Sequence, residues 1–214
     1  MPKTVRDEDR GSRRREEQLE RTRREIMLCA ARVVSRDGYL ATNMRAIAKE
    51  AGFTASSLYT YFSRKEEIFE ALGSELMDRV VETLEEPLPA GLVGEAKLAV
   101  LTHRLNRLSI EYREALVLVF SGATVLPGED APGRLQRLGC VSTAFADWFE
   151  RNTTAKERCG HSPATAARIL QGLHRTFAEQ ALLEANGEID GEVLEKTNAL
   201  SLKFFWAALS APTD

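Results

Sequence analysis

The chain has 214 residues, of which 43% are hydrophobic and 29% are charged, an ordinary composition for a folded protein with a sizeable core. Its net charge of −3 is unevenly spread: residues 1–65 hold 15 Lys and Arg against 9 Asp and Glu, and the remaining 149 residues hold 14 against 23. No apolar run reaches the roughly 18 residues that span a bilayer, and the start of the chain lacks the apolar segment of a secretory signal. We therefore expect a cytoplasmic protein with no membrane partner.

The first 18 residues are polar and charged, so we expect a flexible arm in residues 1–18. Arg10, Arg13, Arg14 and Arg15 form a basic cluster within it. Such an arm either lies along DNA or serves only to keep the chain in solution, and the sequence leaves both alternatives open. A basic beginning joined to an acidic remainder suits a protein that touches nucleic acid at one end, although chance segregation gives the same pattern.

A first helix is predicted from about Leu19 to Arg36. Gly38 follows it, where a glycine often closes a helix. Its apolar side should pack behind the elements that follow, so its role is mainly structural. The residues of this stripe are Ile26, Cys29, Ala30 and Val33.

Two short helices joined by a tight turn are predicted within residues 42–65. Asn43 stands at the N-cap position of the first, and Gly52 stands where a left-handed residue closes it. Thr54 offers the second N-cap, for a segment over residues 55–61 that is too short to be stable alone. Two helices linked by a glycine-containing turn are the helix-turn-helix signature, which predicts binding to duplex DNA. The apolar positions that support the pair are Met44, Ile47, Ala48, Ala51, Leu58 and Phe62.

Four blocks of this region resemble the DNA-binding domain of TetR-family transcriptional regulators. They read TNMRAIA at 42–48, AGFT at 51–54, LYTYF at 58–62 and KEEIF at 65–69, in the order and spacing of that family. The resemblance covers roughly residues 20–75, and the remainder matches only in length and helical character. It implies an amino-terminal three-helix DNA-binding domain, a carboxy-terminal bundle that binds an effector and dimerises, and about nine helices in all.

By this resemblance, Tyr59, Tyr61 and Lys65 contact phosphates, a role that phenolic hydroxyls and an ammonium suit chemically. Thr42 is a further phosphate candidate. Arg45 can read a guanine in bidentate fashion. Two alternatives stay open, namely that Ser57 only caps its helix and that Tyr61 packs on the inner face. The residues expected to meet base edges are Arg45, Thr54, Ala55, Ser56, Ser57 and Thr60.

A further helix is predicted over residues 65–85, opened by a capping box of Ser63 with Glu66. In the resembling family this helix transmits ligand binding to the DNA-reading helices. The Pro- and Gly-rich segment 87–91 breaks it. We therefore expect a DNA-binding domain over 19–86 and an effector-binding and dimerisation domain over 87–214.

The rest of the chain shows helical periodicity without strand signals, which predicts an all-α fold. Helices are expected over 94–112, 113–126, 132–152, 163–186 and 190–210. The resemblance implies that the last two pair with their copies in a homodimer, and a fully buried pair is the alternative. A dimer also suits DNA reading, because two recognition helices related by a two-fold axis read a palindrome. The interface candidates are Ile169, Leu173, Phe177, Leu200, Phe204 and Phe205.

A small-molecule effector is expected to bind between helices of the carboxy-terminal bundle. Polar and aromatic residues on its apolar helices are the candidates, although each could equally be an ordinary core residue. They are His103, Arg107, Tyr112, Phe120, Phe145, Trp148, His174 and Phe177.

No catalytic, nucleotide-binding or metal-ligand motif occurs in the chain, so we expect no enzyme activity, no cofactor and no metal. Three cysteines without paired spacing fit reduced thiols, and a redox role for Cys140 or Cys159 stays open. The interpretation is a repressor that binds a palindromic operator as a dimer and is released by a ligand. An activator of the same fold, and a helical ligand-binding or enzymatic bundle without DNA function, are the alternatives. The effector, the operator and the regulated genes stay open.

Overall fold

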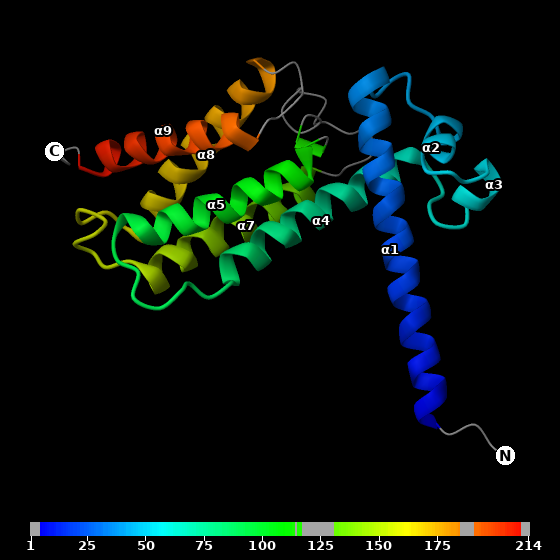
Figure 1. The fold of residues 1–214 in the computed structure, drawn as a ribbon, viewed down its shortest axis with the longest axis horizontal. Coiled ribbons are helices and arrows are strands. Elements are labelled where there is room, and N and C mark those ends of the chain that lie inside the picture. Colours follow the sequence, from blue (N-terminus) through cyan, green and yellow to red (C-terminus); the bar gives the residue numbers. More distant parts are fainter. Residues whose placement is uncertain (1–4, 114, 117–130, 185–190, 211–214) are drawn as a thin grey trace. The chain divides into compact units, whose positions relative to one another are not determined.

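The computed structural model describes residues 5–113, 115–116, 131–184 and 191–210, and every regular element in these ranges is a helix (Figure 1). The all-α class is confirmed, whereas the helix expected over 113–126 lies almost wholly outside the described residues. The chain divides into two compact units, Met1–Leu72 and Gly73–Asp214. The division falls inside a helix and not after residue 86, where the sequence placed it. The helices are α1 (Val5–Asp37), α2 (Met44–Glu50), α3 (Ala55–Leu58), α4 (Lys65–Glu85), α5 (Glu95–Glu111), α7 (Ala131–Asn152), α8 (Pro163–Glu184) and α9 (Gly191–Leu209).

The first unit is built around the carboxy-terminal half of α1. Its predicted stripe is buried, Cys29 included; α1 packs against α2, and α2 packs against α3. A stripe at helical spacing loses its apolar surface from water only when neighbours cover it, so these contacts hold the short helices in place. The fully buried side chains of this core are Ile26, Ala30, Val33, Ile47, Leu58, Phe62, Ile68 and Phe69.

Helix α1 begins at Val5 and not at Leu19, so the segment expected to be a flexible arm forms the first turns of this helix (Figure 1). Its arginines, glutamates and glutamine are good helix formers, which the prediction from polarity alone overlooked. Contacts one turn apart support it: Ser12 Oγ donates to Glu16 Oε1 at 3.2 Å, and Arg21 pairs with Glu25 at 3.3 Å.

The local signals at the helix-turn-helix are confirmed. Asn43 Oδ1 accepts the main-chain N–H groups of Arg45 and Ala46, both at 3.1 Å, and Thr54 Oγ1 accepts that of Ser57 at 3.1 Å. Gly52 has φ +73°, a left-handed conformation that a side chain would strain. Helix α3 ends at Leu58, earlier than expected, and continues as turns to Tyr61.

The predicted capping box before α4 was wrong in its partner. The main-chain N–H and the hydroxyl of Ser63 donate to Glu67 Oε2, at 2.7 and 2.8 Å, and not to Glu66. These bonds lower the pKa of Glu67. Glu66 instead accepts the hydroxyl of Tyr39 at 3.3 Å. Ser63 therefore precedes α4, which begins at Lys65, and both of its bonds go to the third residue of that helix.

The second unit has its own core, in which α8 packs against α7 and α9, and α5 packs against α9. Aromatic rings form its centre: Trp148 meets Phe149 edge-on at 5.2 Å between centroids, and Phe149 stacks on Phe205 at 5.8 Å. The buried residues of this core are Leu84, Leu98, Leu101, Leu105, Phe145, Trp148, Phe149, Ala166, Ala167, Leu170, Phe205 and Leu209.

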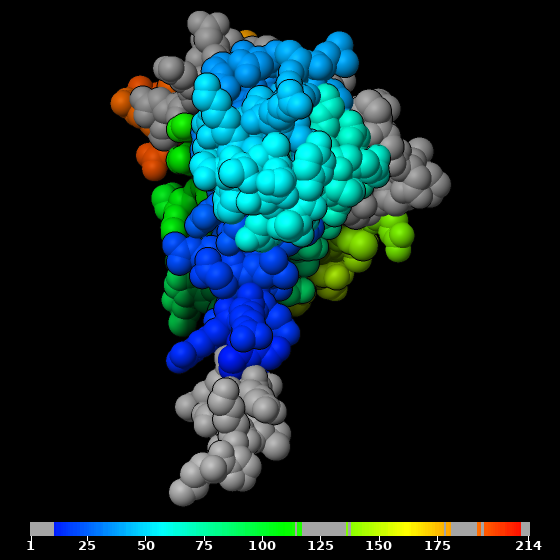
Figure 2. Space-filling view, turned by 90° about the vertical axis from the view of Figure 1, so that its right-hand side faces the viewer, coloured from blue at the N-terminus to red at the C-terminus, as the bar shows by residue number. Residues whose placement is uncertain are grey.

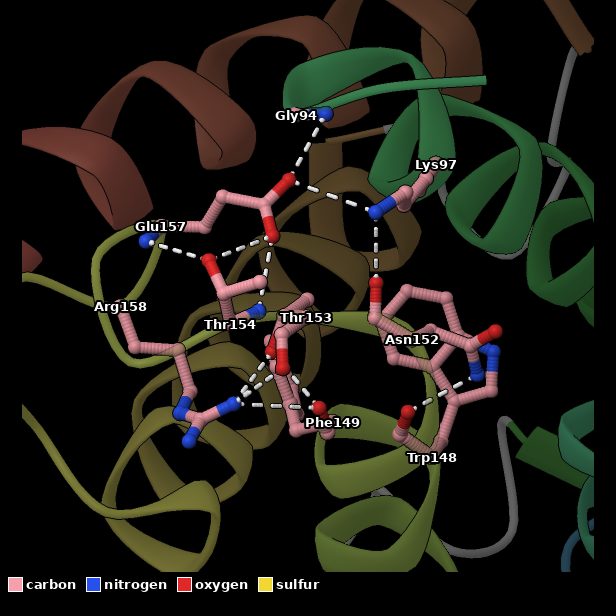
Figure 3. A network of polar contacts seen from close by, with 9 residues as sticks. All are labelled: Gly94, Lys97, Trp148, Phe149, Asn152, Thr153, Thr154, Glu157 and Arg158. Atoms are coloured by element: carbon pink, nitrogen blue, oxygen red, sulfur yellow. Dashed lines mark hydrogen bonds and ion pairs between the residues drawn. The ribbon is translucent and has the colours of Figure 1, made fainter. Parts of the chain in front are cut away.

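A polar network fixes the turn between α7 and α8 (Figure 3). Thr154 and Glu157 form a reciprocal capping box, with Glu157 Oε2 accepting the N–H of Thr154 at 2.7 Å and Thr154 Oγ1 accepting the N–H of Glu157 at 3.2 Å. The other oxygen of Glu157 accepts the Gly94 N–H at 3.1 Å and the Lys97 ammonium at 3.3 Å. One carboxylate therefore joins this turn to the start of α5.

Candidate nucleic-acid interface

The outward side of α2 and α3 presents a small set of exposed polar side chains. Arg45 projects from α2, Ser56 from α3, and Tyr59 and Thr60 from the turn after α3. Tyr59 is 54% exposed although it is a large aromatic residue. Exposed aromatic and arginine side chains beside hydroxyls are suited to hydrogen bonding with phosphates and base edges.

Hydroxyl groups along α3 bond to one another. Thr54 Oγ1 lies 3.0 Å from Ser56 Oγ and 2.8 Å from Ser57 Oγ, and Thr60 Oγ1 donates to the Ser57 carbonyl at 2.7 Å. Ser57 therefore takes part in capping, the alternative left open from the sequence. These bonds fix the hydroxyl positions before any DNA arrives, which lowers the ordering cost of binding.

The two tyrosines lie in different surroundings. Tyr59 is exposed, whereas Tyr61 is half-buried with its ring edge-on to Phe53, centroids 5.7 Å apart. The inner-face packing considered for Tyr61 is therefore present. Ala55 is also half-buried and offers only a methyl group.

The expectation that Thr42 contacts a phosphate is wrong. Its side chain is 2% exposed, and its hydroxyl donates to the Gly38 carbonyl at 2.8 Å. Lys65 is half-buried, and its ammonium donates to the carbonyls of Tyr39 and Thr42, at 2.9 and 2.8 Å. The same ammonium lies 4.5 Å from the centroid of the Tyr39 ring. Burial and the nearby Glu66 raise the pKa of Tyr39 to about 12. Lys65 thus ties α4 to the turn after α1.

Arg23 of α1 was missed by the sequence analysis. Its guanidinium donates to the main-chain carbonyl of Tyr61 and lies 4.1 Å from the Phe62 ring centroid. The signal was available, because Arg23 precedes Ile26 by three positions and so sits near the apolar side of α1. A cation at that place is expected to meet a partner on the packed neighbour.

In the second unit, two effector candidates lie on the outside. His103 and Arg107 are exposed, because Leu98, Leu101 and Leu105 take the inner side of α5. The expectation that they line an interior pocket is therefore wrong.

Of the other effector candidates, Phe120 lies outside the described residues, Phe177 is half-buried beside the exposed Phe204, and the rest face inward. Phe145 and Trp148 belong to the core, Tyr112 is buried with its hydroxyl on Glu75 Oε1 at 2.5 Å, and Phe177 stacks on Phe204.

Buried polar residues that the sequence analysis did not single out lie on α5 and α9. Asn198 Nδ2 donates to the Thr102 carbonyl at 3.4 Å, and Ser201 Oγ donates to the Asn198 carbonyl at 3.1 Å. His174 of α8 hydrogen-bonds with Asn198, and burial lowers its pKa. The members of this polar cluster are Thr102, His174, Asn198 and Ser201.

The dimer candidates divide into two groups. Leu200 and Phe204 are 45% and 51% exposed, and Phe204 stacks on the half-buried Phe177 at 5.9 Å between centroids. Ile169 and Leu173 pack on the core of their own unit. Phe205 is 0% exposed, so the expectation that it meets a partner is wrong. Adjacent residues on a helix point about 100° apart, which separates Phe204 from Phe205.

The first unit therefore has the geometry of a helix-turn-helix. Residues 26–72 match the family model described as bacterial regulatory proteins of the tetR family. This segment is therefore similar to the DNA-binding domain of tetR-family regulatory proteins, and the all-helical fold of the described residues resembles that of a solved regulator structure.

Relatives with known roles agree with this assignment. The chain is 31% identical over 94 residues to the fatty acid metabolism regulator protein of Bacillus subtilis, covering 44% of this chain and 48% of that one. It is 28% identical over 83 residues to the nicotine-responsive transcriptional repressor HdnoR of Paenarthrobacter nicotinovorans, covering 39% and 41%. The matches thus span less than half the length of these relatives.

A solved structure extends the fold similarity over most of the chain. The fatty acid degradation regulator FadR from Bacillus halodurans superimposes with a TM-score of 0.65 at 19% identity, covering 84% of this chain and 94% of that one. At this identity the likeness concerns the fold alone. Among the described residues, no helix combines the length and apolar character needed to cross a membrane.

Proposed function

We propose that this chain is a transcriptional repressor that binds a palindromic operator as a homodimer and releases it when a small molecule binds the second unit. The observation that carries the proposal is the exposed set of Arg45, Ser56, Tyr59 and Thr60 on a correctly capped helix-turn-helix. Because it acts on chromosomal DNA, the protein is assigned to the cytoplasm.

Dimerisation is supported by the exposed apolar pair on α9. Leu200 and Phe204 lie one turn apart, and Phe177 of α8 extends the same apolar surface. Large exposed apolar residues in a cluster favour a protein partner. A two-fold dimer presents two recognition helices to half-sites about 34–36 Å apart or a multiple of that spacing.

Release by a ligand is supported by polar groups inside the bundle. The indole N–H of Trp148 and the amide nitrogen of Gln171 are buried, and neither has an acceptor within the described part of the chain. Buried donors of this kind, together with the polar cluster around Asn198, are places where a ligand can hydrogen-bond. The ligand shifts operator affinity only as far as it prefers one dimer state over the other.

Fluorescence anisotropy on labelled duplexes from the DNA flanking the gene tests the DNA function. Wild type should bind one duplex tightly at moderate salt, and Arg45→Ala should weaken that complex by about 1–3 kcal/mol, because the bidentate hydrogen bonds to a base are removed. Lys49→Ala, an exposed cation on the same helix, is the matched control. If wild type binds no such duplex, the proposed function is wrong.

The dimer is tested by sedimentation of Phe204→Asp against Lys203→Asp, since the two neighbouring residues are both exposed. Only Phe204→Asp should give monomers and remove operator binding.

Reporter output in a strain without the gene distinguishes a repressor from an activator: output should rise for a repressor and fall for an activator.

A further inference from the structure

The hydroxyl groups around α3 have few hydrogens to offer to a partner. Thr54 Oγ1 accepts the main-chain N–H of Ser57 at 3.1 Å, and it also lies within hydrogen-bonding distance of Ser56 Oγ and Ser57 Oγ. A hydroxyl group has one hydrogen and two lone pairs, so Thr54 donates to one of these serines and accepts from the other. The two hydroxyl–hydroxyl bonds therefore use two of the three hydrogens of Thr54, Ser56 and Ser57, whichever serine is the donor.

The hydrogen of the Thr60 hydroxyl is also used within the protein. Thr60 Oγ1 donates to the main-chain carbonyl of Ser57 at 2.7 Å, although Thr60 itself is exposed. Because this hydrogen points back at the main chain, both lone pairs of the oxygen are directed away from that carbonyl. Ser56 Oγ likewise keeps at least one lone pair, since its bond to Thr54 uses no more than one.

Ser56 and Thr60 lie close together on the outward side of the helix-turn-helix. They are four positions apart, a spacing that places side chains on the same side of a helical turn. Both are exposed, whereas Leu58 between them is buried in the core of the unit. The surface formed by α2, α3 and the turn after α3 faces the viewer in Figure 2, in light blue to cyan. The two oxygens therefore form an accessible surface of hydrogen-bond acceptors.

The major groove of duplex DNA carries two kinds of hydrogen-bond donor that suit such a surface, the N6 amino group of adenine and the N4 amino group of cytosine. Guanine O6 and N7 and thymine O4 are acceptors, so an oxygen without a free hydrogen does not bond to them. Arg45 has the opposite character, because a guanidinium group only donates. Helix α2 and the segment from α3 to Thr60 thus offer complementary groups to a duplex.

We propose that Ser56 Oγ and Thr60 Oγ1 accept hydrogen bonds from the amino groups of adenine or cytosine, and that the positions of these amino groups, beside a guanine for Arg45, select the operator half-site. The inference rests on the proposed function. Bonds within the protein hold both oxygens, so they meet the bases without reorganising. A thymine or guanine at the contacted position would place an acceptor against an acceptor and leave both without a hydrogen.

The test replaces single bases in the shortest operator duplex that wild type protects from cleavage. 2-Aminopurine in place of adenine still pairs with thymine but moves the amino group to the minor groove, and pyrimidin-2-one in place of cytosine lacks the amino group. Anisotropy should show a loss of affinity of about threefold to tenfold at the contacted positions, which corresponds to one hydrogen bond. 7-Deazaguanine and deoxyuridine, which lack the guanine N7 and the thymine methyl group, probe the competing contacts.

Ser56→Ala and Thr60→Val link each contacted position to its side chain. A base replacement that weakens binding by wild type should cost the matching variant nothing further, because the accepting oxygen is already gone. Thr60→Ser keeps the hydroxyl group and should respond like wild type. Ser35→Ala changes an exposed serine of α1 and is the matched control. If a variant fails to fold, the base replacements measured with wild type still decide whether amino groups are read.

The inference would be overturned if no replacement of adenine or cytosine weakened binding, or if the losses were the same in wild type, Ser56→Ala and Thr60→Val. Losses confined to 7-deazaguanine would show that only Arg45 reads bases, and losses confined to deoxyuridine would show that methyl groups are read. Either result contradicts the inference and leaves the proposed function intact. Failure of wild type to protect any duplex from the flanking DNA would instead remove the proposed function itself.

Discussion

The ammonium group of Lys65 donates a 2.8 Å hydrogen bond to the main-chain carbonyl of Thr42. The first residue of α4 is thereby joined to the turn that precedes α2, with a second bond to the Tyr39 carbonyl. Two of the three ammonium hydrogens are used inside the protein. Lys65 thus joins the start of α4 to the segment between α1 and α2.

Lys65→Met should lower the free energy of unfolding of the first unit by about 1–3 kcal/mol, because two half-buried carbonyls lose a charged donor. Hydrogen exchange of the amides over residues 26–62 measures this locally. Lys49→Met, an exposed lysine of α2, should change it by less than about 0.5 kcal/mol. Normal protection in Lys65→Met, combined with a loss of DNA affinity, would return Lys65 to the role of a phosphate contact.

Thr42→Val and Tyr59→Phe should separate stability from DNA binding. The Thr42 hydroxyl is buried on the Gly38 carbonyl, so its removal should cost about 1 kcal/mol of stability without changing the salt slope of operator binding. The Tyr59 hydroxyl is at the surface, so its removal should weaken operator binding by about threefold to tenfold and leave stability unchanged. If Thr42→Val weakened operator binding and Tyr59→Phe lowered stability, both assigned roles would be wrong.

Glu157→Gln should destabilise the second unit at neutral pH and much less in acid. Hydrogen bonds, first from the Thr154 main chain, lower the pKa of Glu157 to about 2. The unfolded chain therefore binds this proton more readily than the folded chain. Its stabilising contribution is complete above the ordinary pKa of about 4.5 and is lost as the pH falls toward 2.

Urea unfolding at pH 7 and pH 3, followed by the fluorescence of the two tryptophans of the second unit, Trp148 and Trp206, measures the difference between Glu157→Gln and wild type. The exposed Glu150 of α7 provides the matched control, Glu150→Gln. An equal difference in the free energy of unfolding at both pH values would show that the charge of Glu157 does not contribute to stability.

His174 should make the second unit less stable in mild acid. Burial lowers its pKa, and the hydrogen bond with Asn198 opposes this only partly. The folded state therefore disfavours the proton, so stability should begin to fall as the pH drops through the ordinary value of about 6.5. His174→Gln should show a shallower fall of melting temperature from pH 7.5 to pH 5.5, whereas the exposed His103→Gln should follow wild type.

Local signals in the sequence predicted the helix-turn-helix well, because caps and a left-handed glycine depend on neighbours along the chain. Asn43, Gly52 and Thr54 are examples. The roles of Thr42 and Lys65 were harder to predict, because both are decided by partners distant in the sequence. For Lys65 the partner carbonyls lie 23 and 26 residues away.

Side-chain direction in the second unit was equally hard to predict. Phe204 and Phe205 are neighbours of one residue type, yet one is half exposed and the other fully buried. Which of them faces the core depends on how α9 is rotated against α5 and α8. Apolar residues occur on several sides of α9, so their pattern does not fix that rotation. The buried side also carries the polar residues Asn198 and Ser201, which a prediction from polarity would place outside.

Helix α3 consists of four residues, Ala55–Leu58. Such a helix has no stability of its own and exists only while α1, α2 and α4 hold it. We therefore expect the proposed DNA binding to fail at the first loosening of this unit, before the second unit unfolds. If the chain is the proposed repressor, moderate warming of a culture should raise expression of its target genes.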